Sequence, residues 1–99
     1  MAKKKWAMVI MNESYDPKRD SARLDTEKAE THILTVRNPK EAVDLAKKLY
    51  EEGFGAIEVC GAFGEALARE MYEATGCNVP VGYVTTPEDQ FEKALAFWS

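Results

Sequence analysis

The residues with the clearest chemical potential lie between Glu58 and Gly64, where the sequence reads EVCGAFG. Glu58 and Cys60 alternate with apolar residues, and alternate residues of a strand share a face of the sheet. A carboxylate in a central strand is costly to bury, and such groups are common at active sites. We therefore take Glu58 and Cys60 as candidate catalytic residues, with Glu58 as an acid/base or polar anchor and Cys60 as a nucleophile near a helix start.

Both residues also have a structural interpretation, which the sequence leaves open. Glu58 would then pair with Arg37, Arg69 or a lysine, and Cys60 would be a small buried residue. A nucleophilic Cys60 would need Glu58 or His32 as its base. Because the chain has a single histidine, a catalytic triad or a multi-histidine metal site is not expected, and we predict no metal or cofactor.

Two glycines bracket the predicted turn from this strand into the next helix. Glycine lets a ligand approach the backbone closely, and a helix start offers free N–H donors. We expect a small anionic or carbonyl-bearing metabolite to bind there, although a plain sharp turn explains the glycines as well. The predicted contacts are Gly61, Ala62, Phe63 and Gly64 on the turn, and Asn12, Glu13 and Tyr15 after the first strand.

The elements that must position these residues follow from apolar patterning. Strands are predicted over residues 6–11, 31–37, 56–60 and 79–84, and the continuous apolar run 6–11 is typical of a strand buried on both faces. Helices are predicted from Pro39 to Gly53, from the glycine turn to Gly76, and after Pro87, each with an apolar stripe facing the core. Residues 12–30 are polar and read as a long loop, with weak support for a short helix after Asp16.

Alternating strands and helices predict one α/β domain over residues 1–99, with a mostly parallel sheet of four strands in the flavodoxin-like order 2-1-3-4. In such sheets ligands bind beyond the carboxyl ends of the strands, which is where the glycine turn falls. The direction of the second strand is left open. If it runs parallel to the first, His32 lies far from this crevice, and if it runs antiparallel, His32 lies beside it.

Composition limits the classes of partner. The chain has 13 Lys and Arg against 17 Asp and Glu, a net charge of −4. This acidic balance does not favour binding to nucleic acid or anionic lipid. The apolar run 6–11 is too short for a membrane span or a secretory signal, so we expect a cytoplasmic protein. Cys60 and Cys77 are too few for a disulfide framework and are expected to be free thiols.

Three segments together resemble a family of short prokaryotic α/β proteins that is known only as a domain of unknown function. They are KKWAMVIM with Tyr15-Asp16-Pro17, the segment E-x-C-G-x-F-G from Glu58 to Gly64, and Val79 to Gly82. The resemblance implies a small α/β fold and a cytoplasmic microbial protein, and it implies no catalytic assignment.

Two functions follow from these observations, and the sequence does not decide whether the protein is an enzyme. The first is the binding, with or without turnover, of a small metabolite at the glycine turn. The alternative is a non-catalytic homo-oligomeric assembly or regulatory subunit, because so small a sheet leaves a face or an edge uncovered. Its self-association would use that apolar surface or the last helix, with Phe91, Phe97 and Trp98.

Overall fold

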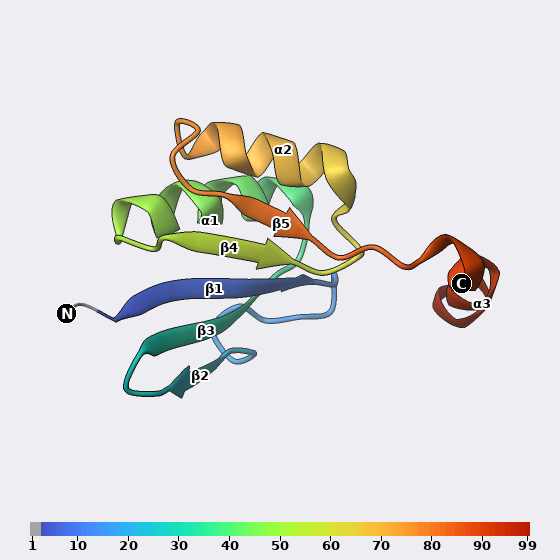
Figure 1. The fold of residues 1–99 in the computed structure, drawn as a ribbon, viewed down its shortest axis with the longest axis horizontal. Helices are drawn as coiled ribbons and strands as arrows, with labels where there is room; N and C mark the ends of the chain where they lie inside the picture. Colours follow the sequence, from blue (N-terminus) through green and yellow to red (C-terminus); the bar gives the residue numbers. More distant parts are fainter. Residues whose placement is uncertain (1–2) are drawn as a thin grey trace.

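The computed structural model describes residues 3–99 and shows a five-stranded mixed sheet with two helices on one face and a third helix standing apart (Figure 1). The elements in chain order are β1 (Lys4–Met11), β2 (Ala22–Asp25), β3 (Ala29–Val36), α1 (Pro39–Glu51), β4 (Ala56–Val59), α2 (Gly64–Ala74), β5 (Val81–Tyr83), the short 3₁₀ helix η1 (Glu88–Gln90) and α3 (Phe91–Trp98). The α/β class expected from the sequence is confirmed.

The sheet has the order β2-β3-β1-β4-β5, with β1 at its centre. β3, β1, β4 and β5 run parallel, and β2 pairs antiparallel with β3. The predicted four-stranded flavodoxin-like sheet is therefore wrong in strand count and order. Sequence patterning missed β2 because its alternation of Ala22 and Leu24 with Arg23 and Asp25 covers only four residues, all of them exposed, within a long polar segment.

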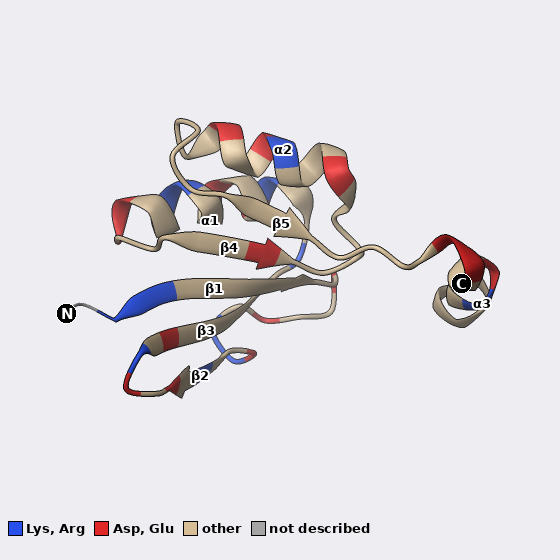
Figure 2. Ribbon diagram, viewed as in Figure 1, with Lys and Arg blue, Asp and Glu red and all other residues tan. Residues whose placement is uncertain are grey.

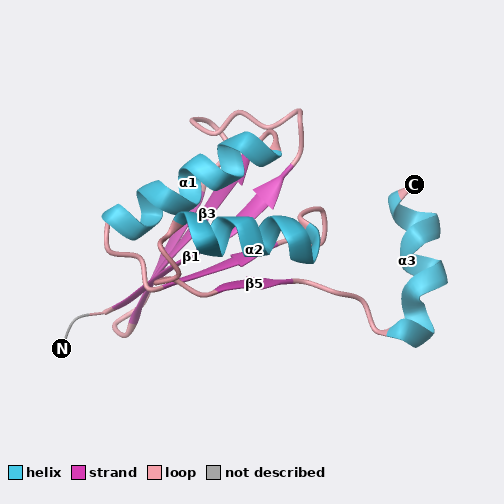
Figure 3. Ribbon diagram, turned by 90° about the horizontal axis from the view of Figure 1, so that it is seen from above, coloured by secondary structure: helices cyan, strands magenta, loops and turns pink. Residues whose placement is uncertain are grey.

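Both packed helices lie on the same face for a topological reason. The β3-to-β4 and β4-to-β5 connections cross the sheet in the same direction, and right-handed crossovers in one direction place their helices on one face. The connection from β1 to β3, which runs the other way, contains β2 and no helix. Figure 3 shows α1 and α2 side by side over the sheet, so the opposite face receives no helix from this chain's crossovers.

The core lies between the sheet and these two helices. Its buried residues are Ala7, Val9, Val36, Ala42, Ala46, Leu49, Phe54, Ile57, Val59, Phe63, Leu67, Ala68, Met71 and Val79. Asn38 caps the start of α1, because its Oδ1 accepts a hydrogen bond from Glu41 N at 2.9 Å. The Glu41 carboxylate in turn accepts from the N–H of Arg37, the residue before the cap, at 2.8 Å.

The other face of the sheet receives no helix, and the segment between β1 and β2 covers its carboxyl end, where it buries Thr35 beside Ile10. We call the remaining surface the open face; it includes Trp6, Met8 and Ile10 of β1, Thr31 and Ile33 of β3, Leu24 of β2, and Glu58 of β4. Trp6, Met8, Ile10 and Ile33 are half-buried, and Leu24 is 58% exposed. The prediction that residues 6–11 are buried on both faces is wrong, because only the face with Ala7 and Val9 meets the helices.

Helix α3 does not join the core. None of its residues is buried, and Phe97 and Trp98 are 75% and 81% exposed. Figures 1 and 3 show α3 held away from the sheet by the segment that follows β5. The radius of gyration is 14.0 Å, against roughly 12.6 Å for a compact chain of this length. The prediction that the apolar stripe of this helix packs on the core of its own chain is therefore wrong.

Candidate functional site

The candidate ligand site lies where the parallel strands end. Backbone hydrogen bonds hold the turns there: Asn12 N donates to Val36 O, and Cys60 N donates to Val9 O, both at 3.1 Å. The structure therefore brings the turn after β1 to the same edge of the sheet as the turn after β4. Asn12 Oδ1 accepts a hydrogen bond from Ser14 N at 2.8 Å, so the side-chain oxygen of Asn12 already has a partner within its own turn.

The β4–α2 turn combines a buried anchor with exposed glycines. Phe63 is 6% exposed and belongs to the core, whereas Gly61, Ala62 and Gly64 are exposed. Gly64 has φ +73°, a left-handed conformation that glycine adopts without strain. No side chain caps the start of α2, and its first turn contains the acidic residue Glu65. The first amides of α2 are therefore not satisfied by a side-chain cap.

The two candidate catalytic residues differ in their surroundings. Glu58 is exposed on the open face, and within residues 3–99 no salt bridge involves it. Cys60 follows the end of β4, is half-buried and packs against the core. β4 ends at Val59, and the Cys60 amide still donates to Val9 O at the start of the turn. A role for Glu58 as the base of Cys60 stays a prediction.

His32 lies in a separate cluster. Because β3 runs parallel to β1, His32 lies away from the carboxyl edge, which resolves the alternative left open by the sequence. Its Nε2 is 3.0 Å from Glu30 Oε1, and its ring meets the edge of Phe54 with a centroid distance of 4.9 Å. Glu30 also forms a salt bridge with Arg23 at 2.6 Å. The hydrogen bond from His32, and then the Arg23 charge, lower the pKa of Glu30.

The segment between β1 and β2 is a set of turns that is tied to the sheet. The Thr35 hydroxyl donates to Asp20 O at 2.7 Å, and Thr35 is 7% exposed. The Asp20 carboxylate accepts from Arg19 Nε at 2.9 Å and from Asp16 N at 2.8 Å. The Arg19 hydrogen bond, helped by that of Asp16, lowers the pKa of Asp20 to about 2. This segment contains no helix after Asp16.

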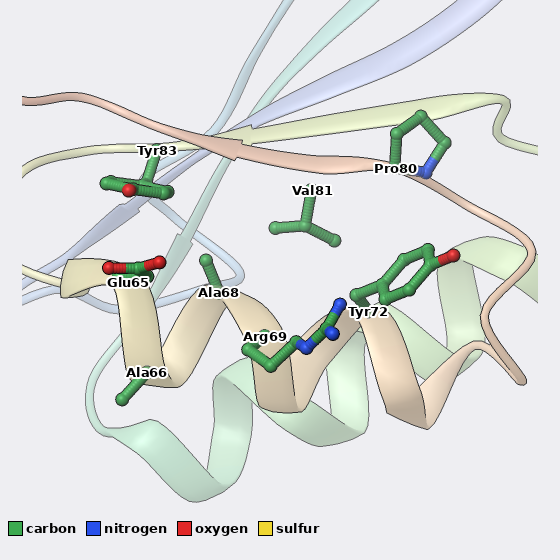
Figure 4. Close-up of a pocket in the computed structure, with 8 residues that line it drawn as sticks. All are labelled: Glu65, Ala66, Ala68, Arg69, Tyr72, Pro80, Val81 and Tyr83. Atoms are coloured by element: carbon green, nitrogen blue, oxygen red, sulfur yellow. The ribbon is translucent and has the colours of Figure 1, made fainter.

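A groove that the sequence analysis missed runs between α2 and the edge strand β5 (Figure 4). It is open to solvent, has a volume of about 960 Å³, and is lined by Glu65, Ala66, Ala68, Arg69, Tyr72, Pro80, Val81 and Tyr83. The Arg69 guanidinium lies over the Tyr72 ring, 5.6 Å from its centroid. The sequence contained one indication of this groove, because the spacing of Glu65, Arg69 and Tyr72 places them on one side of a helix.

Over residues 3–99, no group of three or more His, Cys, Asp or Glu side chains is placed to hold a metal ion. No helix within that range has the length and apolar character needed to cross a membrane.

Comparison with protein-family models matches residues 4–99 to a family described as "Family of unknown function (DUF6506)". Comparison with curated proteins gave no match, and comparison with solved structures gave none either. The match spans every strand and helix described above.

Proposed function

The chain belongs to the DUF6506 family of unknown function, and from that premise and the geometry above we propose that it acts as a homo-oligomeric assembly subunit. The open face of the sheet is the single observation that carries this proposal. Its partner is a second copy of the same chain, and a net charge of −4 disfavours nucleic acid or an anionic membrane surface. We place the protein in the cytoplasm, where Cys60 and Cys77 stay free thiols.

The physical argument concerns the cost of leaving the open face in water. β1 carries no charged residue beyond Lys5 (Figure 2), and its open-face side chains Trp6, Met8 and Ile10 adjoin Ile33 of β3. Proteins that stay monomeric rarely expose contiguous apolar patches of more than a few hundred Å². Burying apolar surface gains about 25 cal/mol for each Å² removed from water, so covering this face contributes favourably to association.

Light scattering during size-exclusion chromatography tests this proposal. The full chain should elute at micromolar concentration with at least twice its monomer mass of 11.1 kDa. Ile33→Lys should shift it to the monomer, because the variant buries a charge wherever the open face is covered. Lys40→Glu is the matched control, since Lys40 lies on the outer surface of α1 with its side chain 86% exposed. A wild-type chain that is monomeric across the micromolar range would overturn the proposal.

A second candidate function is the binding of a small anionic or carbonyl-bearing metabolite at the β4–α2 turn. The observation that favours it is the start of α2, where no side chain caps the first amides beside the exposed Gly61 and Gly64. Oriented amides at a helix start bind carboxylate or phosphate oxygens and polarise carbonyl groups. Asn12, Glu13 and Tyr15 would supply further contacts from the turn after β1.

Thermal shift with inorganic phosphate, a sugar phosphate and a dicarboxylate tests this second function. At least one probe should raise the melting temperature of the wild type, and Gly61→Val should abolish that rise by placing a branched side chain on the turn. Gly55→Val is the matched control at the opposite end of β4, because a Cβ at either glycine lies 3.8 Å from a carbonyl oxygen. No shift with any probe, or an equal shift in Gly61→Val, would count against a site here.

A further inference from the structure

We infer that α3 of each copy packs on the open face of a second copy, so that two chains exchange their C-terminal helices. This inference rests on the self-assembly proposed above and deepens it by naming the two surfaces that meet. It concerns two apolar surfaces within residues 3–99, the open face and α3.

Helix α3 has one strongly apolar side. Phe91, Leu95 and Trp98 recur at the spacing of one helical face and are 53%, 57% and 81% exposed. Glu92 and Lys93 lie on the opposite side of the helix, where they would stay in water. Within the described chain, the aromatic contact of the Trp98 ring is with the neighbouring Phe97, at a centroid distance of 4.9 Å. A helix of eight residues is marginal in water by itself, so covering its apolar stripe would stabilise it.

The open face offers the matching surface. Its centre consists of Met8 on β1 and Ile33 on β3, which are paired in register, with Trp6 nearby on β1. Its polar boundary is Glu58, which lies on the same side of the sheet as Gly82 of the edge strand β5, since a Cβ at Gly82 would lie 3.7 Å from Glu58 Cγ. A helix lying across β1 and β3 would therefore cover apolar side chains and leave Glu58 at its margin. This is also the face that lacks a helix because the β1-to-β3 connection contains none.

The tether between β5 and α3 directs the helix away from its own sheet. Pro87 has φ −54° and ψ 146°, an extended conformation, and the residue before a proline, Thr86, is also biased toward extended backbone. Figures 1 and 3 show this segment continuing outward from β5, with α3 beyond the carboxyl edge of the sheet. An extended, proline-stiffened tether that presents an apolar helix outward favours capture by a neighbouring copy.

The size of the resulting contact is that of a stable dimer. A buried aromatic side chain covers roughly 150–250 Å², so the exposed parts of Phe91, Leu95, Phe97 and Trp98 amount to roughly 400–500 Å². Two helices, together with the two sheet areas they cover, then bury roughly 1,600–2,000 Å², which is within the standard range for specific interfaces. Because the exchange is reciprocal, the contact closes on two chains and does not propagate into a filament.

Thiol cross-linking between two different chains tests which surfaces meet. One protein carries Thr31→Cys on the open face, and the other carries Ala94→Cys on the apolar side of α3. Both are made in a Cys60→Ser and Cys77→Ser background, which removes the native thiols. After mixing by refolding, a flexible bifunctional maleimide should give a covalent dimer that contains one chain of each kind. Each protein treated alone is the control for contacts between like positions.

The possible results distinguish the exchange of α3 from self-assembly in general. A dimer by light scattering without the mixed cross-link overturns the helix exchange and leaves self-assembly standing. A monomer overturns both. A chain that carries both cysteines and cross-links only within itself, while monomeric, shows that α3 folds onto its own sheet and also overturns both.

A matched pair of helix variants gives an independent measurement. Leu95→Asp places a charge in the apolar stripe and should raise the dimer dissociation constant at least about tenfold. Ala96→Asp introduces the same residue one position later, on the other side of the helix, and should leave the constant within about twofold. Circular dichroism confirms that both variants are folded. Equal dissociation constants for the two variants would contradict the proposed packing of α3.

Discussion

At the scale of single residues, Asp20 is the group whose ionisation is most clearly tied to the folded state. Its carboxylate accepts hydrogen bonds from Arg19 and from the N–H of Asp16, and these lower its pKa from 3.8 to about 2. A lowered pKa means that the unfolded chain binds the proton more tightly. The contribution of Asp20 to stability is therefore complete above about pH 4 and is lost as the pH falls through about 2.

We expect Asp20→Asn to weaken the acid dependence of stability. The wild-type urea midpoint should fall between pH 4 and pH 2, and in the variant it should fall less over the same window, because one carboxylate with a lowered pKa has been removed. Arg19→Gln should reduce the fall in the same direction, since the Arg19 hydrogen bond is the largest cause of the shift. If the urea midpoint of Asp20→Asn fell between pH 4 and pH 2 as much as that of the wild type, this account would be contradicted.

At the scale of elements, the turn from α2 to β5 depends on one buried hydroxyl. Thr75 is 1% exposed, and its Oγ1 donates to Tyr72 O at 2.6 Å while accepting from Asn78 N at 3.2 Å and Val79 N at 3.1 Å. Gly76 follows with φ +69°, so the chain reverses within two residues of the helix end. The Thr75 hydroxyl thus joins the last turn of α2 to the residues that lead into the edge strand.

We expect Thr75→Val to lower the free energy of unfolding by about 1–3 kcal/mol, because two amides lose their acceptor in a buried position. Thr75→Ser keeps the hydroxyl and loses only a methyl group, so its cost should be nearer to 1 kcal/mol. Urea titration of both variants checks the order of these losses. A larger loss in Thr75→Ser than in Thr75→Val would show that packing, and not the hydrogen bonds, stabilises this turn.

At the scale of the whole molecule, stability and assembly are linked. If folding is completed by a second copy, tenfold more protein adds about 1.4 kcal/mol per dimer at equilibrium. The melting temperature should then rise by about 3–5 °C for each tenfold increase in concentration. Differential scanning calorimetry over two decades of concentration measures this. Leu95→Asp should melt at a lower temperature than Ala96→Asp at each concentration, and equal melting temperatures for the two variants would argue against assembly through α3.

Local sequence pattern was sufficient wherever a few adjacent residues define the structure. Asn38 caps α1 through Glu41 N, and Gly53 and Gly76 take up the left-handed backbone that follows a helix. These features depend on hydrogen bonds and backbone sterics within one turn, which are readable from neighbouring residue types. The α/β class follows from the same local signals, since strands and helices have different apolar periods.

The long-range arrangement was needed to assign each face of the sheet. The run Trp6 to Met11 is apolar on both sides, and nothing within it shows that one side meets α1 and α2 while the other receives no helix. That outcome depends on the direction of the crossovers and on β2, whose four exposed residues are too short a run to identify a strand. For the same reason, Glu58 could be placed in a strand from sequence but not on the exposed side of the sheet, because burial is a property of what packs above a residue.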